Sequence, residues 1–185
     1  MRTAHLTIAL LTISAFLTSR VNAEFKNPFK KKTDKQRTKE VNEAIDLLKG
    51  KDPSIKEMFK KSNGYAVFPN VAKAGLGVGG AIGKGQLFQD GKLLGSTSLK
   101  QASFGLQLGG QTYSEVIFFE NAKALKKFKS GKFELGAQVS AVAITKGAAA
   151  GAQFNNGIAV FTMTKKGLMY EAAVAGQRFD FKPAK

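Results

Sequence analysis

Apolar side chains recur at helical spacing in the first part of the chain. Four of them, at positions i, i+3, i+4 and i+7, form one stripe: Val41, Ala44, Ile45 and Leu48. This period predicts an amphipathic helix that ends at Gly50. Asp52 and Pro53 then match an N-cap and a first helical residue, so a second helix is predicted there. A third helix is expected between a cap at Asn121 and an end at Gly131.

From Tyr65 onward the apolar period shortens to two, which is typical of β-strands. We expect about eight or nine short strands joined by frequent turns. The first strand is expected to stop at Pro69, and Asp90-Gly91 indicates a hairpin. Further strands are expected at residues 135–143, 157–164 and 167–175. This pattern favours an antiparallel sheet or a partly closed barrel.

Glycine is concentrated between residues 73 and 85. Glycine weakens strands, so its recurrence at Gly75, Gly77 and Gly79 needs a physical reason. The bare backbone on that face would let another element pack closely or let the sheet curl sharply. The same residues match a dinucleotide-binding pattern, but no helix start follows them, so a bent strand is the preferred interpretation. The predicted fold is α+β, with short N-terminal helices packed on a glycine-rich, strongly curved antiparallel β-sheet or partly closed barrel.

The first residues have the pattern of an export signal. An apolar run from Leu6 to Leu17 follows a slightly basic start, and Ala23 stands at the end of a signal-peptidase pattern. The run is short for a membrane span, which needs about 20 residues. We therefore expect cleavage after Ala23 and export to the periplasm or the cell exterior. The predicted division is a signal peptide at residues 1–23, a basic N-terminal segment at 24–39 and a single domain at 40–182.

Cysteine and histidine are almost absent from this chain. Its 185 residues include no Cys and one His, His5, which lies in the predicted signal peptide. The cleaved protein would have no thiol and no imidazole, which excludes Cys-His and Ser-His-Asp catalysis and Cys- or His-ligated zinc. The acidic residues of the strand-rich part, Glu115 and Glu120 among them, are expected to be solvated at turns and strand ends. No enzyme, cofactor or metal site is predicted.

The chain carries a large positive charge, with 29 Lys and Arg against 13 Asp and Glu and a formal net charge of +16. Part of this excess lies in the N-terminal segment, where lysines alternate with phenylalanines: Lys30, Lys31 and Lys32 with Phe25 and Phe29. Lysine beside phenylalanine suits a membrane interface. We expect these five residues to engage the lipid headgroup layer.

A second lysine cluster lies on the third predicted helix. Lys123, Lys126 and Lys127 share one face at helical spacing, opposite Leu125 and Phe128. A polybasic patch attracts anionic lipid by about 1 kcal/mol per charge near the surface. Nucleic acid is disfavoured as a partner, because the chain is predicted to be exported and is poor in the arginine that phosphate and base readers use.

Several blocks of the sequence resemble the SYLF domain family. They run in the family's order and spacing over about residues 40–180: residues 64–85, 103–111, 116–119, 124–128 and 131–136. The resemblance implies a non-enzymatic, lipid-binding domain. In the eukaryotic branch the family binds phosphoinositides and actin through basic N-terminal sequence, whereas bacterial relatives resemble exported, stand-alone lipid-binding proteins. Actin binding is therefore not expected here.

The predicted function is a non-enzymatic lipid-binding protein of the cell envelope that engages anionic phospholipid. The alternative is a structural outer-membrane β-barrel protein, which export, alternation and glycine content permit. The predicted N-terminal helices, the absence of Trp and the three Tyr residues count against that alternative, because barrels carry aromatic girdles. A carboxylate enzyme such as a glycosidase has no positive motif.

Overall fold

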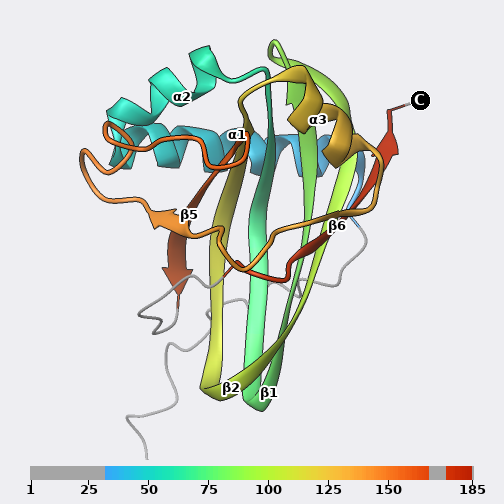
Figure 1. The fold of residues 1–185 in the computed structure, drawn as a ribbon, viewed down its shortest axis with the longest axis vertical. Coiled ribbons are helices and arrows are strands. Elements are labelled where there is room, and N and C mark those ends of the chain that lie inside the picture. Colours follow the sequence, from blue (N-terminus) through green and yellow to red (C-terminus); the bar gives the residue numbers. More distant parts are fainter. Residues whose placement is uncertain (1–31, 167–173, 185) are drawn as a thin grey trace, which may run out of the picture. The chain divides into compact units, whose positions relative to one another are not determined.

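The computed structural model describes residues 32–166 and 174–184, and it describes their side chains except at 76–77, 103–109 and 166. Its elements are two helices, a long strand pair, a third helix and four shorter strands (Figure 1). They are α1 (Asp34–Lys51), a 3-10 turn η1 (Pro53–Ile55), α2 (Lys56–Lys61), β1 (Gly64–Gln89), β2 (Lys92–Phe119), α3 (Ala122–Lys129), β3 (Phe133–Glu134), β4 (Ala141–Ala143), β5 (Ile158–Lys166) and β6 (Arg178–Pro183). The predicted α+β class is confirmed.

The helix α1 begins earlier than its apolar stripe indicates. Thr33 Oγ1 accepts a hydrogen bond from the Gln36 amide at 3.2 Å, and Gln36 Oε1 accepts one from the Thr33 amide at 3.0 Å. This reciprocal capping box starts the helix at Asp34, so the end of the basic segment 24–39 is helical. The predicted stripe is confirmed, since Val41, Ala44, Ile45 and Leu48 are all buried. No helix among the described residues is long and apolar enough to cross a bilayer.

Two very long strands replace most of the short strands that the sequence predicts. β1 and β2 pair antiparallel from Gly64↔Phe119 to Gln89↔Lys92. Asp90 and Gly91 make the turn with φ of 50° and 72°, which confirms the predicted hairpin. The expected stop at Pro69 is wrong, because the pairing register shifts between Phe68 and Val71 and the strand continues past the proline.

The β1–β2 ribbon folds back on itself at its glycine-rich middle (Figure 1). A Cβ added at Gly75 would lie 2.7 Å from the Cα of Gly79, four residues further along the same strand. A Cβ at Gly85 would clash with the Val67 carbonyl and lie 2.8 Å from Phe68 Cδ1, again within β1. The strand therefore bends tightly enough to pack against its own beginning, which confirms the predicted curl.

The other strands add to β2 on both halves of the ribbon. The sheet order is β3-β6-β2-β5-β4, with β1 also paired to β2. β5 pairs with β2 over residues 112–119, and β6 pairs with β2 over residues 95–100. The pair β4–β5 is parallel, so the prediction of a wholly antiparallel sheet is wrong at this edge.

One of the expected short strands differs from the structure. Residues 135–143 include only the three-residue β4, although Leu135 and Val139 are buried as the alternation suggests. Turns break the segment because the Val139 amide bonds back to the Gly136 carbonyl at 3.1 Å instead of to a neighbouring strand. Most of the segment 167–175 lies outside the described residues, and the strand expected at 157–164 is present as β5.

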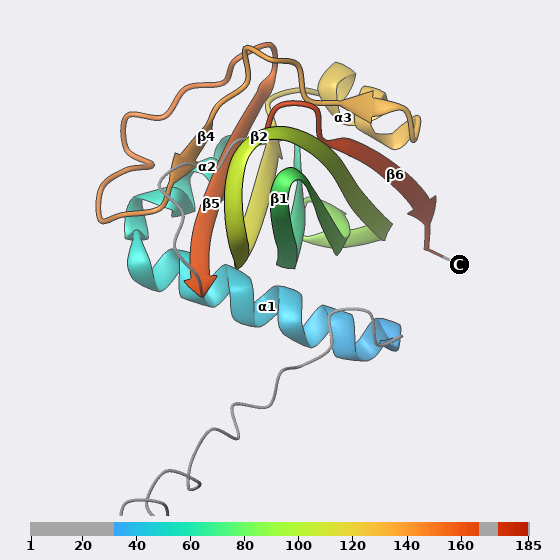
Figure 2. The same cartoon turned by 90° about the horizontal axis from the view of Figure 1, so that it is seen from below.

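The curled sheet has a core on each face (Figure 2). Successive side chains of β2 point to opposite faces of the sheet. Ile117 and Phe119 therefore belong to the core that α3 covers, and Val116 and Phe118 belong to the core that α1 covers. α1 therefore covers one face of the sheet, and α3 covers the other (Figure 2). Such two-sided burial explains why this stretch of β2 is continuously apolar.

A buried carboxylate fastens the loop after β4 to the end of α1. Asp52 is fully buried and accepts hydrogen bonds from the Ser54 amide and hydroxyl at 3.1 and 2.6 Å, and from the amides of Gly147 and Ala149 at 3.1 and 2.7 Å. Burial by itself raises the pKa of Asp52. The hydrogen bonds from Ser54, Ala149 and Gly147 outweigh that effect, so the pKa lies below its ordinary value.

We predict that Gly85→Ala destabilises the fold, because the new methyl group meets backbone atoms of β1 that cannot move without opening the ribbon. The free energy of unfolding should fall by about 1–3 kcal/mol in urea titrations. Gly50→Ala is the control, since nothing lies within 4 Å of its Cβ position and α1 should gain up to about 1 kcal/mol. Equal effects of the two substitutions would contradict the self-packing of β1.

We predict that Asp52→Asn lowers the free energy of unfolding at neutral pH by about 2–4 kcal/mol, because an amide cannot accept all four hydrogen bonds. The folded-state pKa is depressed, so the stabilisation is present above the unfolded pKa and is lost as pH falls through the folded pKa. Urea titrations from neutral to acid pH should show a shallower acid loss in the variant. Asp46→Asn, on the exposed face of α1, should change neither quantity.

Candidate functional site

The helix α3 presents the second lysine cluster to solvent. Asn121 Oδ1 accepts from the Ala124 amide at 3.0 Å and caps the helix, as predicted. Phe128 anchors the opposite side, with ring centroids 4.8 Å from Phe119 and 5.4 Å from Phe133 and Phe179. This anchoring directs Lys123, Lys126 and Lys127 outward, and all three are exposed.

Charge within α3 and its flanking turns is of one sign. The segment 121–132 contains five lysines and no acidic residue. Among the described residues, no salt bridge includes Lys123, Lys126 or Lys127. Lys127 Nζ lies 5.8 Å from the centre of the Phe133 ring, so its side chain lies along an apolar surface with its charge at the edge. We call Lys123, Lys126 and Lys127 the α3 lysine face.

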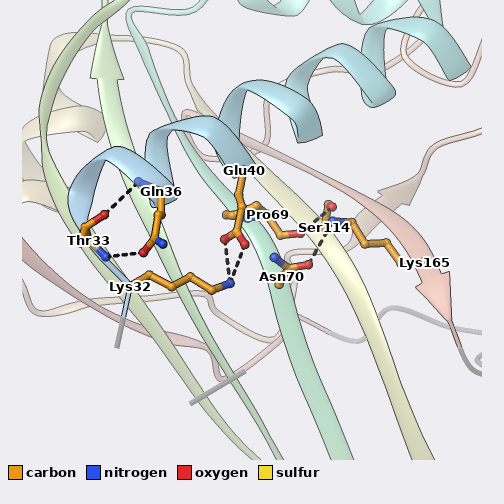
Figure 3. A network of polar contacts seen from close by, with 8 residues as sticks. All are labelled: Lys32, Thr33, Gln36, Glu40, Pro69, Asn70, Ser114 and Lys165. Atoms are coloured by element: carbon orange, nitrogen blue, oxygen red, sulfur yellow. Dashed lines mark hydrogen bonds and ion pairs between the residues drawn. The ribbon is translucent and has the colours of Figure 1, made fainter. Parts of the chain in front are cut away.

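The N-terminal cluster is described only at its last lysine. Phe25, Phe29, Lys30 and Lys31 lie outside the described residues. Lys32 Nζ donates to both carboxylate oxygens of Glu40 at 2.7 and 2.8 Å, and about a quarter of its side chain is exposed (Figure 3). Lys32 is thus held against α1 by an ion pair, and its predicted lipid contact stays a prediction.

Close to this ion pair, polar side chains connect β1 to β2 and β5 (Figure 3). Lys165 Nζ donates to Asn70 Oδ1 at 3.1 Å, and Ser114 Oγ donates to the Pro69 carbonyl at 2.9 Å. Burial lowers the pKa of Lys165, while the nearby carboxylates of Glu40 and Glu43 oppose that shift. The Ser114 contact occupies the carbonyl of Pro69 in the β1 bulge and joins it to β2, and the Lys165 contact joins the next residue of the bulge to β5.

A row of polar side chains lies inside the folded ribbon, where the sequence analysis expects none. Gln111, Tyr113 and Glu115 alternate along β2 on the face whose next members are Ile117 and Phe119. Each of the three is at most 7% exposed, and Glu115 is fully buried. The expectation that Glu115 is a solvated strand-end carboxylate is therefore wrong, because the strand continues on both sides of it and the ribbon curls over it.

The segment before β6 closes this row. Gln177 Nε2 donates to Glu115 Oε2 at 3.0 Å and lies 3.3 Å from the Tyr113 hydroxyl. Glu115 Oε1, Gln177 Oε1 and the Gln111 amide group have no hydrogen-bond partner within the described part of the chain. Gln101 adds a further contact, from its Nε2 to the Ala175 carbonyl at 2.9 Å. We call Gln101, Gln111, Tyr113, Glu115 and Gln177 the interior polar row.

Burial controls the protonation of this row. Loss of solvent raises the pKa of Glu115 to about 8, and the hydrogen bond from Gln177 reduces the shift only partly. The pKa of Tyr113 is also raised, first by burial and then by the charge of Glu115. Glu115 is therefore mainly a neutral carboxylic acid at pH 7. Within the described ranges, no group of three or more His, Cys, Asp or Glu side chains could hold a metal ion.

A surface pocket of about 280 Å³ lies where α1, β1, β2 and β6 meet. Its charged lining comes from five side chains: Asp34, Arg37, Lys84, Asp180 and Lys182. The hydroxyl groups at residues 96–98 add hydrogen-bonding capacity. Because both signs of charge line the pocket, its electrostatics favour a small group that is itself mixed in charge over a simple anion.

Comparison with known proteins identifies the family. The family model described as "Ysc84: Las17-binding protein actin regulator" matches residues 100–183. The SYLF domain is the domain of this family. Residues 100–183 belong to the SYLF family. The chain is also 30% identical over 167 residues to Beta cell expansion factor A of Aeromonas veronii, covering 84% of this chain and 60% of that protein.

The SYLF match contains both candidate features. The α3 lysine face and all five residues of the interior polar row lie within residues 100–183. SYLF domains are lipid-binding, non-catalytic domains, which the sequence resemblance also implies. Sequence reasoning found the α3 lysine face from helical spacing. It missed the interior polar row. The period of two that places Gln111 and Glu115 on the same face of the strand as Phe119 could have predicted their burial.

We predict that Glu115→Gln stabilises this SYLF domain at neutral pH. The folded state holds the Glu115 proton up to about pH 8 and the unfolded state releases it near 4.5, so the folded state binds more protons between these values. Stability of the unaltered protein should therefore fall as pH rises through this window, by at most about 1.4 kcal/mol per pH unit. Urea titrations across the window should show a flatter profile for the variant.

The control for this prediction is Glu120→Gln, at an exposed residue directly after the same strand. It should leave the pH profile unchanged. If Glu115→Gln lowers stability at every pH, Glu115 is ionised in the folded state and the prediction is wrong.

Proposed function

We propose that this protein is a non-enzymatic lipid-binding protein of the cell envelope that engages anionic phospholipid at a membrane surface. The observation that carries the proposal is the α3 lysine face, three exposed lysines held on one side of a helix whose other side is locked into the core. Each such charge near an anionic surface contributes about 1 kcal/mol. Three acting together therefore favour reversible binding that falls with salt.

Membership of the SYLF family supports the general lipid-binding role. The chain spans 60% of the length of Beta cell expansion factor A, so the activity of that whole protein is not carried over here. Actin regulation, which the family description names, and actin binding are not proposed, because the sequence of residues 1–23 predicts export. The export signal, cleavage after Ala23 and a periplasmic or secreted location are parts of the same proposal.

The N-terminal cluster has a secondary place in the proposal. Phe25, Phe29, Lys30 and Lys31 supply apolar and basic groups in the sequence pattern of an interfacial segment. Lys32 would first have to leave its ion pair with Glu40. We therefore assign the main electrostatic contact to the α3 lysine face and a supporting contact to residues 25–32.

The proposal predicts that the chain from residue 24 onward cosediments with vesicles of phosphatidylcholine containing phosphatidylglycerol, and that binding declines with salt. Lys123→Glu, Lys126→Glu and Lys127→Glu combined should weaken binding by roughly tenfold or more, because attraction becomes repulsion at the contact. The control variant changes three other exposed lysines to Glu, on the N-terminal helices: Lys51, Lys56 and Lys60. Its net charge changes by the same amount, and we expect a much smaller loss of vesicle binding.

Two outcomes decide the mechanism. Equal losses in the two triple variants would mean that net charge and not the α3 lysine face determines binding. Absence of binding to any vesicle by the folded protein would overturn the proposed membrane contact altogether.

A further inference from the structure

The bend of the β1–β2 ribbon is an uncharged, apolar end of the molecule. No charged residue lies between Lys73 and Lys84 in β1, or between Lys100 and Glu115 in β2. Val78 is 64% exposed and Ile82 is 39% exposed. They are two of the four exposed large hydrophobic residues among those described, so this end concentrates apolar side chains that the fold does not bury.

The bend also extends past the neighbouring strands. Within the described residues, β5 pairs with β2 only as far as Thr112, and β6 pairs with β2 only as far as Lys100. Between these positions the described pairing of β2 is with β1 alone. In this two-stranded arm the backbone groups that face the partner strand are paired, whereas those on the two outer edges are not, so side chains at the bend can enter an apolar medium while the edges stay in the polar interface.

Lysines lie beside Ile82 and behind Val78. Lys100 pairs directly with Ile82 across the ribbon, and Lys84 follows two residues after Ile82; both lysines are exposed. Lys165 lies on β5 beside the other half of the ribbon, paired in register near Tyr113. Lys100 also lies 3.5 Å from Asp180 in an exposed ion pair. An apolar end followed by long cationic side chains matches the succession of acyl chains and anionic headgroups in a bilayer.

We propose that the ribbon bend is a membrane anchor, with Val78 and Ile82 entering the acyl region of an anionic bilayer while Lys84 and Lys100 remain at headgroup level. This inference rests on the proposed lipid-binding function. The bend lies at the opposite end of the molecule from α3 (Figure 1), so the bend and the α3 lysine face would meet a flat bilayer in alternative orientations. A second copy of the chain is a poorer occupant, because the lysines behind the tip would face lysines of the same kind. An anionic lipid surface complements them instead.

The absence of cysteine allows a direct test, since a single introduced thiol can be labelled cleanly. Val78→Cys carries an environment-sensitive fluorophore at the bend, and Leu93→Cys carries it beside the Asp90-Gly91 turn, where the native side chain is 40% exposed. With vesicles containing phosphatidylglycerol, emission from position 78 should shift to shorter wavelength and be quenched by brominated acyl chains. Emission from position 93 should not change.

Cosedimentation of the same samples separates this inference from the proposed function. Sedimentation without a change at position 78 overturns the anchor and leaves surface binding in place. Absence of sedimentation overturns both. A change at position 78 that depends on protein concentration and not on vesicles assigns the bend to a contact between copies and overturns the anchor.

Charge variants give a second, label-free test. Val78→Glu with Ile82→Glu should weaken vesicle binding by roughly tenfold or more, because two carboxylates oppose both the acyl region and the anionic headgroups. Leu47→Glu with Leu93→Glu is the matched control, since those side chains are 56% and 40% exposed and lie away from the bend. Equal binding by the two double variants, each folded by circular dichroism, would overturn the anchor.

Discussion

The close approach of β1 to its own beginning is the constraint on which the rest of the structure depends. At Gly85 the absence of a side chain lets the backbone reach the Val67 carbonyl, and at Gly75 it allows the bend that brings Gly79 near. Glycine in a strand costs conformational entropy. Here it also permits the bend by which the ribbon encloses its own concave face. Without that closure, β5 and β6 would add to a flat pair and could not share one core.

Closure also explains the unusual polarity of the interior. The curl of the ribbon buries side chains on the concave side of β2 whatever their polarity, and both Phe119 and Glu115 are buried there. The carboxyl group responds by holding its proton, and Gln177 supplies one hydrogen bond to it. The interior polar row therefore lowers stability at neutral pH, and the two apolar cores on either face of β2 compensate for it.

The two proposed membrane contacts lie at opposite ends of this architecture and correspond to alternative orientations on a bilayer (Figure 1). The aromatic cluster around Phe128 holds α3 rigidly, so the α3 lysine face is preorganised for an anionic surface. The glycines that fold the ribbon leave Val78 exposed at its bend. One compositional feature, glycine at alternate positions, thus supports both the enclosed core and the proposed anchor. Asp52 serves a separate purpose, fixing the loop after β4 to the end of α1.

Local signals in the sequence determined the helices, their caps and the Asp90-Gly91 turn, because these depend on a few neighbouring residues and on fixed backbone geometry. The lysine pattern of α3 could be predicted for the same reason. Strand length could not, since Pro69 is accommodated only by a register shift against a partner that lies far along the chain. The burial of Glu115 was likewise decided by tertiary structure, because local alternation places a side chain on a face of a strand and only the folding of the ribbon determines which face is enclosed.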